Sequence, residues 1–439
     1  MLFGTSGIRG VANKKLTPEF SIKLGLALGT ALNGGRVIVG NDVRLSSDML
    51  KYSFISGLLA TGNEVFDAGL APTPAIALAS KYYDTGVIIT ASHNPPEYNG
   101  FKFWKNGIGY SEHAERKIES LFFKKRFELV NWNKLKKVRK INILGEYVDT
   151  IVGACKIRRR FDIVVDCANS VASLVVPHIF IKHNVISINS CLDGRFPGRL
   201  PEPASENLFC LKGVVMDSGA DLGIAYDGDA DRFVVMNNKG ELIGGDILVA
   251  IFSRYYLENG RGRKVIVTTI DASYCIDDVA REYDAEVVRT KVGDVAVARE
   301  IVKRDAVFGG EPSGSFIFPD VHLAPDGPLA SLKFLEILCS WDLDELVKEI
   351  PRYFLIRDSI KCGEEVKEKI MNYVRENIGS VFDGDVINVD GVRVNCKGFW
   401  VLIRPSGTEP KIRVTVEAKS EERARKILKR AKKLVGEVD

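Results

Sequence analysis

The ten residues from 86 to 95, GVIITASHNP, join a short apolar run to a polar loop. The apolar part at 87–89 suits a strand that is buried on both faces. The same order of an apolar run, a polar loop and a helical pattern recurs from residues 37–42, 162–166 and 264–268. This alternation predicts parallel α/β sheets. Ligands of such sheets lie beyond the carboxyl ends of the strands, so the loops after these runs are the candidate functional segments.

The chain of 439 residues is too long for one ordinary domain, and its length predicts roughly two to four domains. A basic stretch at 124–140, with eight Lys or Arg and one acid, is interpreted as a solvated connector after the first domain. The predicted domains are 1–140, 141–243, 244–350 and 351–439.

The last of these segments has a different pattern. The runs at 400–403 and 412–416 read as two strands that are joined by a loop. Ser420 is placed to cap a following helix that has one apolar face. We therefore expect a small α+β domain at the C-terminal end.

Composition narrows the classes of function. The hydrophobic share of 46% and the charged share of 27% are typical of a globular protein. A net charge of +4 gives no support for a nucleic-acid partner, although it suits an anionic substrate. The eight cysteines form no C-x-x-C pair, so they are expected to be reduced. With no apolar run near the roughly 18 residues of a membrane span and no signal-peptide pattern, we expect a cytoplasmic protein without a membrane partner.

The loop DGDADR at 227–232 follows the apolar run at 222–225. Its carboxylates, Asp227, Asp229 and Asp231, can converge on one cation if the loop curls. Hard oxygen ligands of this kind suit Mg²⁺ or Ca²⁺. An EF-hand would need a glycine at its sixth position and a glutamate at its twelfth, and both are missing here. Mg²⁺ usually keeps a phosphate oxygen as a further ligand.

Four further segments are candidate functional loops, and three of them are short segments around a serine, an arginine and a glutamate. Ser92 comes just after a predicted strand, but it lies in no G-x-S-x-G motif of a serine hydrolase. Arg9 lies in a glycine-rich loop that can approach a phosphate. Glu311 and Ser313 follow the run at 306–308. Taken alone, the segments of Ser92 and Glu311 are better explained as turns, and the glycine-rich loop is a weak signal because such loops are common.

The loop RPSGTEP at 404–410 is the fourth segment. Arginine binds phosphate through two hydrogen bonds, and hydroxyls with an exposed amide complete such a site. A plain hairpin turn explains the proline and glycine equally well, but it does not explain Arg404, Thr408 and Arg413 around one connection.

Taken together, the loops TASHNP, DGDADR, GEPSG and RPSGTEP resemble the signature loops of the α-D-phosphohexomutases, in the family order and over essentially the whole chain. The resemblance implies three similar α/β domains with mixed sheets and a smaller C-terminal α+β domain around a central cleft. It implies an isomerase that interconverts hexose 6-phosphate and hexose 1-phosphate through a phosphoserine and a 1,6-bisphosphate, with Mg²⁺ as cofactor and a sugar phosphate as substrate.

The resemblance also implies roles for single residues. Ser92 would be phosphorylated, and its phosphate would share the metal ion with Asp227, Asp229 and Asp231. The roles at the reacting phosphoryl group fall to a general acid/base, Lys102, and to three neutralising groups, Arg9, His93 and Arg232. The substrate-binding residues would be Lys291, Glu311 and Ser313 at the sugar, and Arg404, Ser406, Gly407, Thr408 and Arg413 at the phosphate that is not reacting.

Within the family, the sugar loop GEPSGS carries Ser315 where many relatives that act on mannose or glucose phosphates have a histidine. This loop and the segment KVGD at 291–294 resemble the archaeal type of phosphoglucosamine mutase. His322 could replace that histidine, but a lone histidine near Pro319 and Pro325 is expected at the surface. A phosphomannomutase/phosphoglucomutase remains the alternative, and a magnesium phosphatase and a nucleic-acid-binding protein remain alternatives from other classes.

Overall fold

The computed structural model of the chain describes residues 2–4, 6–406 and 410–436. These residues form two compact units. The N-terminal unit contains the described residues up to Gly245 together with Ser313–Leu343. The C-terminal unit contains Asp246–Pro312 and the described residues from Asp344 onward.

The first sheet of the N-terminal unit has the strand order β1-β5-β4-β2-β3-β7, with β6 beside β5. Its strands β2, β3 and β4 are parallel, and β5 runs antiparallel to β4 and β1. The strands are β1 (Ile8–Val11), β2 (Arg36–Asn41), β3 (Glu64–Leu70), β4 (Thr85–Ile89), β5 (Tyr98–Lys105), β6 (Ile108–Gly109) and β7 (Val138–Lys140). The helices of this segment are α1 (Pro18–Leu32), α2 (Ser47–Ala60), α3 (Thr73–Ala79) and α4 (Glu112–Lys124).

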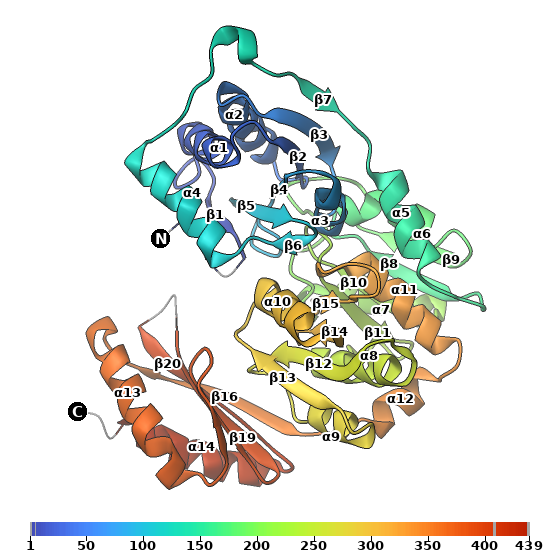
Figure 1. Cartoon of the computed structure of the whole chain (residues 1–439). Coiled ribbons are helices and arrows are strands. Elements are labelled where there is room, and N and C mark those ends of the chain that lie inside the picture. The colour runs from blue at the N-terminus through green and yellow to red at the C-terminus, as the bar shows by residue number, and fades with distance from the viewer. Residues whose placement is uncertain (1, 5, 407–409, 437–439) are drawn as a thin grey trace. The chain divides into compact units, whose positions relative to one another are not determined.

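Local chemistry explains why the helices of this sheet form. Thr17 caps α1 by accepting the amide hydrogen of Phe20 at 3.1 Å, and Pro18 occupies the first helical position. Helices α1, α2 and α4 bury apolar side chains against one face of the sheet (Figure 1). This packing leaves the carboxyl ends of β2 and β4 free to carry polar loops.

The second sheet of the N-terminal unit has the order β11-β10-β8-β9 and is also mixed, because only β11 is antiparallel to its neighbour. Phe334 of α11 packs on Phe233 of β11 with ring centroids 5.9 Å apart. The strands are β8 (Asp162–Asp166), β9 (Asn184–Ile188), β10 (Leu222–Tyr226) and β11 (Phe233–Asn237). The other elements are α5 (Leu144–Gly153), α6 (Val176–Ile179), α7 (Phe209–Ser218), α11 (Gly327–Leu338) and β15 (Phe316–Ile317).

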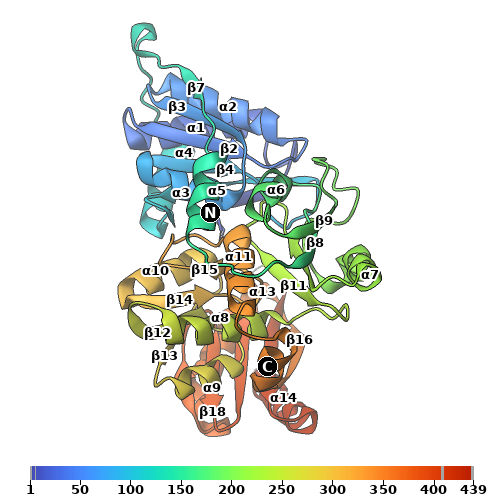
Figure 2. The same ribbon diagram turned by 90° about the vertical axis from the view of Figure 1, so that its right-hand side faces the viewer.

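The C-terminal unit begins with a parallel sheet in which β12 lies between β13 and β14 (Figure 2). Phe252 of α8 packs on Phe308 of β14, with ring centroids 5.7 Å apart. The elements are α8 (Gly245–Asn259), β12 (Arg263–Thr269), α9 (Cys275–Glu282), β13 (Glu286–Thr290), α10 (Asp294–Arg304), β14 (Ala306–Gly310) and α12 (Leu343–Glu349).

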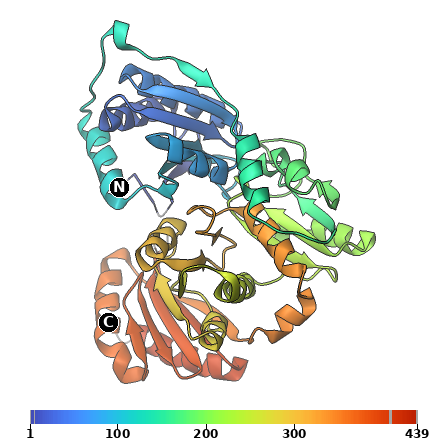
Figure 3. The same ribbon diagram turned by 45° about the vertical axis from the view of Figure 1, so that its right-hand side comes forward.

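The remaining strands form an antiparallel sheet, drawn in orange to red in Figure 3. Its strand order is β16-β20-β19-β18-β17. Helices α13 and α14 share one apolar core with this sheet. On β19, Trp400 and Leu402 pack instead with Ile270, which follows β12. The elements are β16 (Phe354–Lys361), α13 (Glu364–Val381), β17 (Asp385–Ile387), β18 (Val392–Cys396), β19 (Phe399–Pro405), β20 (Lys411–Ala418) and α14 (Glu421–Gly436).

The predicted fold class is confirmed: three α/β segments precede a smaller α+β segment. Ser420 accepts the amide hydrogen of Arg423 at 3.3 Å at the start of α14, as its capping role requires. The basic connector is exposed along most of its length, as expected, and its residues 138–140 also add strand β7 to the edge of the first sheet beside β3. In the part of the chain that the structure describes, no helix combines the length and the apolar character that crossing a membrane requires.

A buried carboxyl in α8 leads to a prediction about stability. Asp246 accepts the amide hydrogen of Ser273 at 2.7 Å, and its burial raises the pKa to about 6. Because the folded pKa lies above the unfolded value of 3.8, the free energy of unfolding falls as the pH rises between these values and stays lower above them. The neutral variant Asp246→Asn should therefore raise the free energy of unfolding at about pH 8 by roughly 3 kcal/mol. The melting temperature should rise accordingly.

Thermal denaturation between about pH 4 and pH 8 checks this expectation, because the advantage of the variant should shrink as the pH falls. The matched control is Asp383→Asn, which neutralises an exposed carboxylate in the same unit. A stabilisation of equal size at every pH would contradict the assignment to Asp246.

Candidate active site

The loop after β4 places a serine inside the protein. Ser92 is 1% exposed and has a positive φ of 53°. Its amide hydrogen binds the Thr90 hydroxyl at 2.9 Å. Its own hydroxyl donates to Asp227 at 2.7 Å and lies 3.2 Å from Nδ1 of His93. The end of β4 therefore places the buried Ser92 hydroxyl in contact with the acidic loop at 227–232.

The acidic loop after β10 curls as the sequence predicts. Ala230 has a positive φ of 59°, and a Cβ atom at Gly228 would lie 2.5 Å from the Ser92 carbonyl oxygen, so only glycine fits there. Asp227, Asp229 and Asp231 are all buried, and each offers an oxygen within 4.8 Å of the others. Three converging carboxylates form a cluster that suits a hard divalent cation.

Lys102 of β5 enters the same cluster. Its Nζ atom lies 2.7 Å from Oδ2 of Asp229 and 2.6 Å from Oδ2 of Asp231. Lys102 reaches this position because it pairs with Ile88 of β4, a few residues before Ser92. The sheet register therefore places the predicted acid/base beside the predicted metal ligands.

The three buried carboxylates of this cluster favour the binding of a cation. Burial and the neighbouring Asp231 and Asp229 carboxylates raise the pKa of Asp227 well above its ordinary value. Burial also opposes ionisation of Asp229, but the Lys102 ammonium and two hydrogen bonds outweigh it and lower the pKa of that carboxyl. One oxygen each of Asp229 and Asp231 is buried with no hydrogen-bond partner among the described residues. The donor set thus fits a divalent metal, which would satisfy both oxygens.

The predicted phosphoryl-neutralising groups lie around Ser92. Arg9 of β1 donates to Oδ1 of Asn94 at 2.7 Å, within the serine loop. Arg232 is the last residue of the acidic loop, and its guanidinium lies 3.9 Å from a carboxylate oxygen of Glu202. Burial, together with Arg232 and Arg9, lowers the pKa of His93 to about 2. The His93 imidazole is therefore neutral, and its Nδ1 atom lies within hydrogen-bonding distance of the Ser92 hydroxyl.

The predicted sugar-binding residues follow the strands of the C-terminal unit, with one exception. Lys291 is exposed after β13. Glu311 is buried after β14 and accepts the amide hydrogen of Gly293 at 3.1 Å, so the structure brings these two loops together. The exception is Ser313, which is exposed and belongs to the N-terminal unit.

The predicted phosphate loop begins at the end of β19. Arg404 pairs with Arg413 across β19 and β20, and its guanidinium lies 3.4 Å from Asp390. Lys367 of α13 donates to the Ser406 carbonyl oxygen at 2.8 Å. Nε of Arg404 and Oγ of Ser406 are buried without a hydrogen-bond partner among the described residues. These donors are available for an anion.

Two other predicted phosphate ligands, Gly407 and Thr408, lie outside the described residues.

The surface position expected for His322 is wrong. This residue is 2% exposed, and its Nε2 atom lies 2.7 Å from Oδ2 of Asp326. Asp326 caps α11, and Tyr147 donates to its other oxygen at 2.9 Å. Neighbouring prolines suggested a surface turn, whereas hydrogen bonds to distant segments satisfy this polar cluster inside the protein.

Other residues of the site had no recognisable signal. Thr73 binds the Asp229 carbonyl oxygen through its amide at 2.9 Å and Oδ2 of Asp229 through its hydroxyl at 2.5 Å. Arg199 donates to the Tyr226 carbonyl oxygen at 2.6 Å, one residue before Asp227, and to Asp166 at 2.9 Å. In the sequence, Thr73 marks only a helix start between two prolines, and Arg199 lies in an irregular segment.

Comparison with known proteins is consistent with this architecture. The four phosphoglucomutase/phosphomannomutase family domains match in order: alpha/beta/alpha domain I at residues 1–129, domain II at 145–240, domain III at 244–354 and the C-terminal domain at 366–434. The chain belongs to the phosphoglucomutase/phosphomannomutase family.

Two curated relatives are similar to the chain over nearly their whole length. A probable phosphoglucosamine mutase of Pyrococcus abyssi is 46% identical over 99% of this chain and 97% of its own. The phosphoglucosamine mutase of Methanocaldococcus jannaschii is 46% identical over 99% of this chain and 98% of its own. Among solved structures, a phosphoglucomutase/phosphomannomutase family protein of Burkholderia thailandensis aligns with a TM-score of 0.90 and 28% identity, over 99% of this chain and 96% of its own.

Proposed function

We propose that this chain interconverts glucosamine 6-phosphate and glucosamine 1-phosphate through a phosphorylated Ser92 and a 1,6-bisphosphate intermediate. The observation that carries the proposal is the buried Ser92 hydroxyl, 2.7 Å from Asp227 in a cluster that also holds Lys102. The relatives named phosphoglucosamine mutase, at 46% identity, support this substrate over the mannose and glucose phosphates of the alternative.

The cluster would hold Mg²⁺ through Asp227, Asp229 and Asp231, together with the phosphate on Ser92. When bound, the metal supplies positive charge for the transferring phosphoryl group. Arg9 and Arg232 add positive charge on the protein side, and neutral His93 donates a hydrogen bond. Phosphoryl transfer depends mainly on such positioning and charge neutralisation.

Lys102 is the proposed general acid/base. In the first half-reaction the phosphoryl group leaves the Ser92 oxygen for a sugar hydroxyl, and the proton of that hydroxyl passes to Lys102, which would have to be an uncharged amine at this point. A metal bound to Asp229 and Asp231 would favour that form. In the second half-reaction the bisphosphate has turned over, its other phosphoryl group returns to Ser92, and the Lys102 ammonium gives the proton back to the leaving oxygen. The carboxylates of Asp229 and Asp231, 2.7 and 2.6 Å away, accept hydrogen bonds from the Lys102 nitrogen and hold it in place in both forms.

The remaining predicted residues would recognise the substrate. Glu311, Ser313 and Lys291 are proposed to bind the sugar. The proposed clamp for the phosphate that is not reacting is Arg404, Ser406, Gly407, Thr408 and Arg413. Each predicted domain (1–140, 141–243, 244–350 and 351–439) would then contribute at least one loop to the active site.

Loss of the clamp should separate binding from catalysis. Arg404→Ala removes an arginine that can bind a phosphate through two hydrogen bonds, so the substrate would be held at one end only. We expect KM to rise about 100-fold, with a smaller fall in kcat because remote binding energy also supports the chemical step. Phosphorylation of Ser92 should persist, because its loop and the carboxylate cluster are unchanged.

Steady-state kinetics and phosphoserine content of the same preparation check this expectation. The matched control is Arg425→Ala, which removes an exposed arginine from α14 in the same unit. If Arg404→Ala kept the wild-type KM and kcat, the loop after β19 would be a turn without a role in binding.

The proposed function itself is tested by intact mass before and after incubation with glucose 1,6-bisphosphate, followed by mapping of the phosphate. We expect a gain of one phosphoryl group at Ser92, and faster turnover with glucosamine 1-phosphate than with glucose 1-phosphate or mannose 1-phosphate. Release of free phosphate at the turnover rate would indicate the alternative phosphatase, and absence of phosphate on Ser92 would reject the mechanism.

A further inference from the structure

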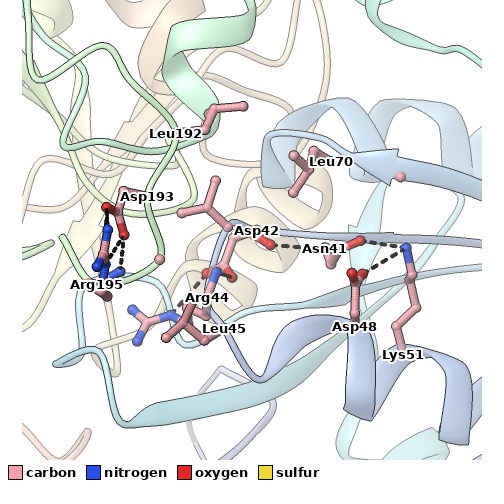
Figure 4. Close-up of a pocket in the computed structure, with 13 residues that line it drawn as sticks. Asn41, Asp42, Arg44, Leu45, Asp48, Lys51, Leu70, Leu192, Asp193 and Arg195 are labelled. Atoms are coloured by element: carbon pink, nitrogen blue, oxygen red, sulfur yellow. Dashed lines mark hydrogen bonds and ion pairs between the residues drawn. The ribbon is translucent and has the colours of Figure 1, made fainter.

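A buried arginine lies behind the Ser92 loop. Arg44 is in the connection between β2 and α2, and its side chain is fully buried. Its Nε atom binds Oδ2 of Asp42 at 3.0 Å, and its amide binds Oδ1 of the same carboxylate at 3.0 Å. Figure 4 shows this pair at the wall of a cavity of about 610 Å³. The guanidinium is therefore held by one carboxylate from its own segment.

The other four donors of this guanidinium bind backbone carbonyl oxygens of the serine loop. Nη2 donates to Ser92 at 2.8 Å and to Asn94 at 2.6 Å. Nη1 donates to Pro95 at 2.6 Å and to Tyr98 at 2.9 Å. A guanidinium has five N–H donors in a rigid planar fork, so every donor of Arg44 is used. Because Tyr98 begins β5, one side chain joins the serine loop to the strand that carries Lys102.

A second path runs from Asp42 to the same serine. Oδ2 of Asp42 accepts the Thr90 hydroxyl hydrogen at 2.6 Å, and the Thr90 oxygen accepts the Ser92 amide hydrogen at 2.9 Å. Ser92 is therefore held on both sides, at its amide through Thr90 and at its carbonyl through Arg44. Its positive φ of 53° is unfavourable for a serine and persists only where the surroundings impose it.

The loop that follows β9 of the second sheet also packs against the segment of Arg44. The guanidinium lies 5.2 Å from the ring centroid of Phe196. A Cβ atom at Gly194 would lie 2.2 Å from the Val43 carbonyl oxygen, so glycine permits this close approach. Arg44 is consequently clamped between two segments and has little freedom to move.

We propose that Arg44, supported by Asp42, is a positioning residue that sets the Ser92 oxygen in line for phosphoryl transfer. The proposal rests on the proposed function, because it assigns Arg44 to the step in which the Ser92 phosphoryl group is transferred. Arg44 touches only the backbone of the loop, so it acts through Ser92 and not on the substrate. A misplacement of about 1 Å at a reacting atom costs on the order of 100-fold in rate.

The test is the variant Arg44→Lys, which keeps the positive charge but has three donors on one nitrogen and cannot serve four carbonyl oxygens and Asp42 together. The measurement is the single-turnover rate of phosphoryl transfer from phosphorylated Ser92 to glucosamine 1-phosphate, expressed per phosphoserine. We expect this rate to fall on the order of 100-fold, with an unchanged KM and an unchanged magnesium titration. The matched control is Arg36→Lys, the same change at the exposed start of β2, the strand that precedes Arg44.

A milder variant keeps the proposal testable if Arg44→Lys does not fold. Thr90→Val preserves side-chain shape and removes the link between Asp42 and the Ser92 amide, so the same rate should fall roughly ten-fold. A merely structural role would lower the melting temperature and the fraction of molecules that become phosphorylated, but not the rate per phosphoserine. A wild-type rate per phosphoserine in either folded variant would overturn the proposal. Failure of the wild-type protein to phosphorylate Ser92 would instead reject the proposed function.

Discussion

We expect Ser92→Ala to abolish mutase turnover while the protein stays folded. The variant removes the only atom that is proposed to carry the phosphoryl group, and loss of a catalytic nucleophile can lower kcat on the order of 10⁶-fold. Folding should survive, because alanine adds no atoms and the backbone bonds of Ser92 to Thr90 and Arg44 do not involve its hydroxyl. The change removes the contacts of the hydroxyl with Asp227 at 2.7 Å and with Nδ1 of His93 at 3.2 Å.

Turnover, thermal denaturation and phosphate incorporation from glucose 1,6-bisphosphate are the measurements for this variant. Ser56→Ala is the matched control, because Ser56 is exposed on α2 and its hydroxyl donates to the Tyr52 carbonyl oxygen of its own helix. Normal turnover, or a phosphoryl group that still appears on the Ser92→Ala protein, would show that the phosphate is carried elsewhere.

The second large effect is expected for Asp229→Asn. The variant removes one of three carboxylates. It also replaces the ion pair between Asp229 and Lys102, whose atoms lie 2.7 Å apart, with a weaker neutral contact. We expect kcat to fall roughly 100-fold or more, and the magnesium concentration for half-maximal activity to rise by at least about ten-fold. An amide oxygen can still accept a hydrogen bond from Thr73, so the loop should keep its conformation.

A magnesium titration of activity and of thermal stability distinguishes these effects. Asp217→Asn is the matched control, because it neutralises an exposed carboxylate on α7 of the same unit. An unchanged titration in Asp229→Asn would reject the metal assignment, even if kcat had fallen through the disturbed Lys102.

The strands and loops were predictable because their signals are local. A short run of β-branched residues has to be buried on both faces, so its ends can be read from neighbouring residues in the chain, as for β8 at Asp162–Asp166. Alternating acids with small residues between them, as at 227–232, imply a curled loop with converging oxygens, and the structure shows that loop. Resemblance to a family then added the roles of residues whose local pattern was only that of a turn.

The residues that hold this site in place could be found only from the fold. Arg44, Arg199 and Thr73 act on backbone or side-chain groups of the two central loops from segments that are remote in sequence. Such contacts depend on strand register and on which faces of the sheets are covered, and no spacing of nearby residues encodes them. His322 illustrates the same limit, because a histidine among prolines suggests a surface turn until Asp326 and Tyr147 provide a buried partner network. The sequence alone therefore predicted which groups would do chemistry, since these need particular atoms in particular loops, whereas packing between distant segments decided how precisely those atoms are held.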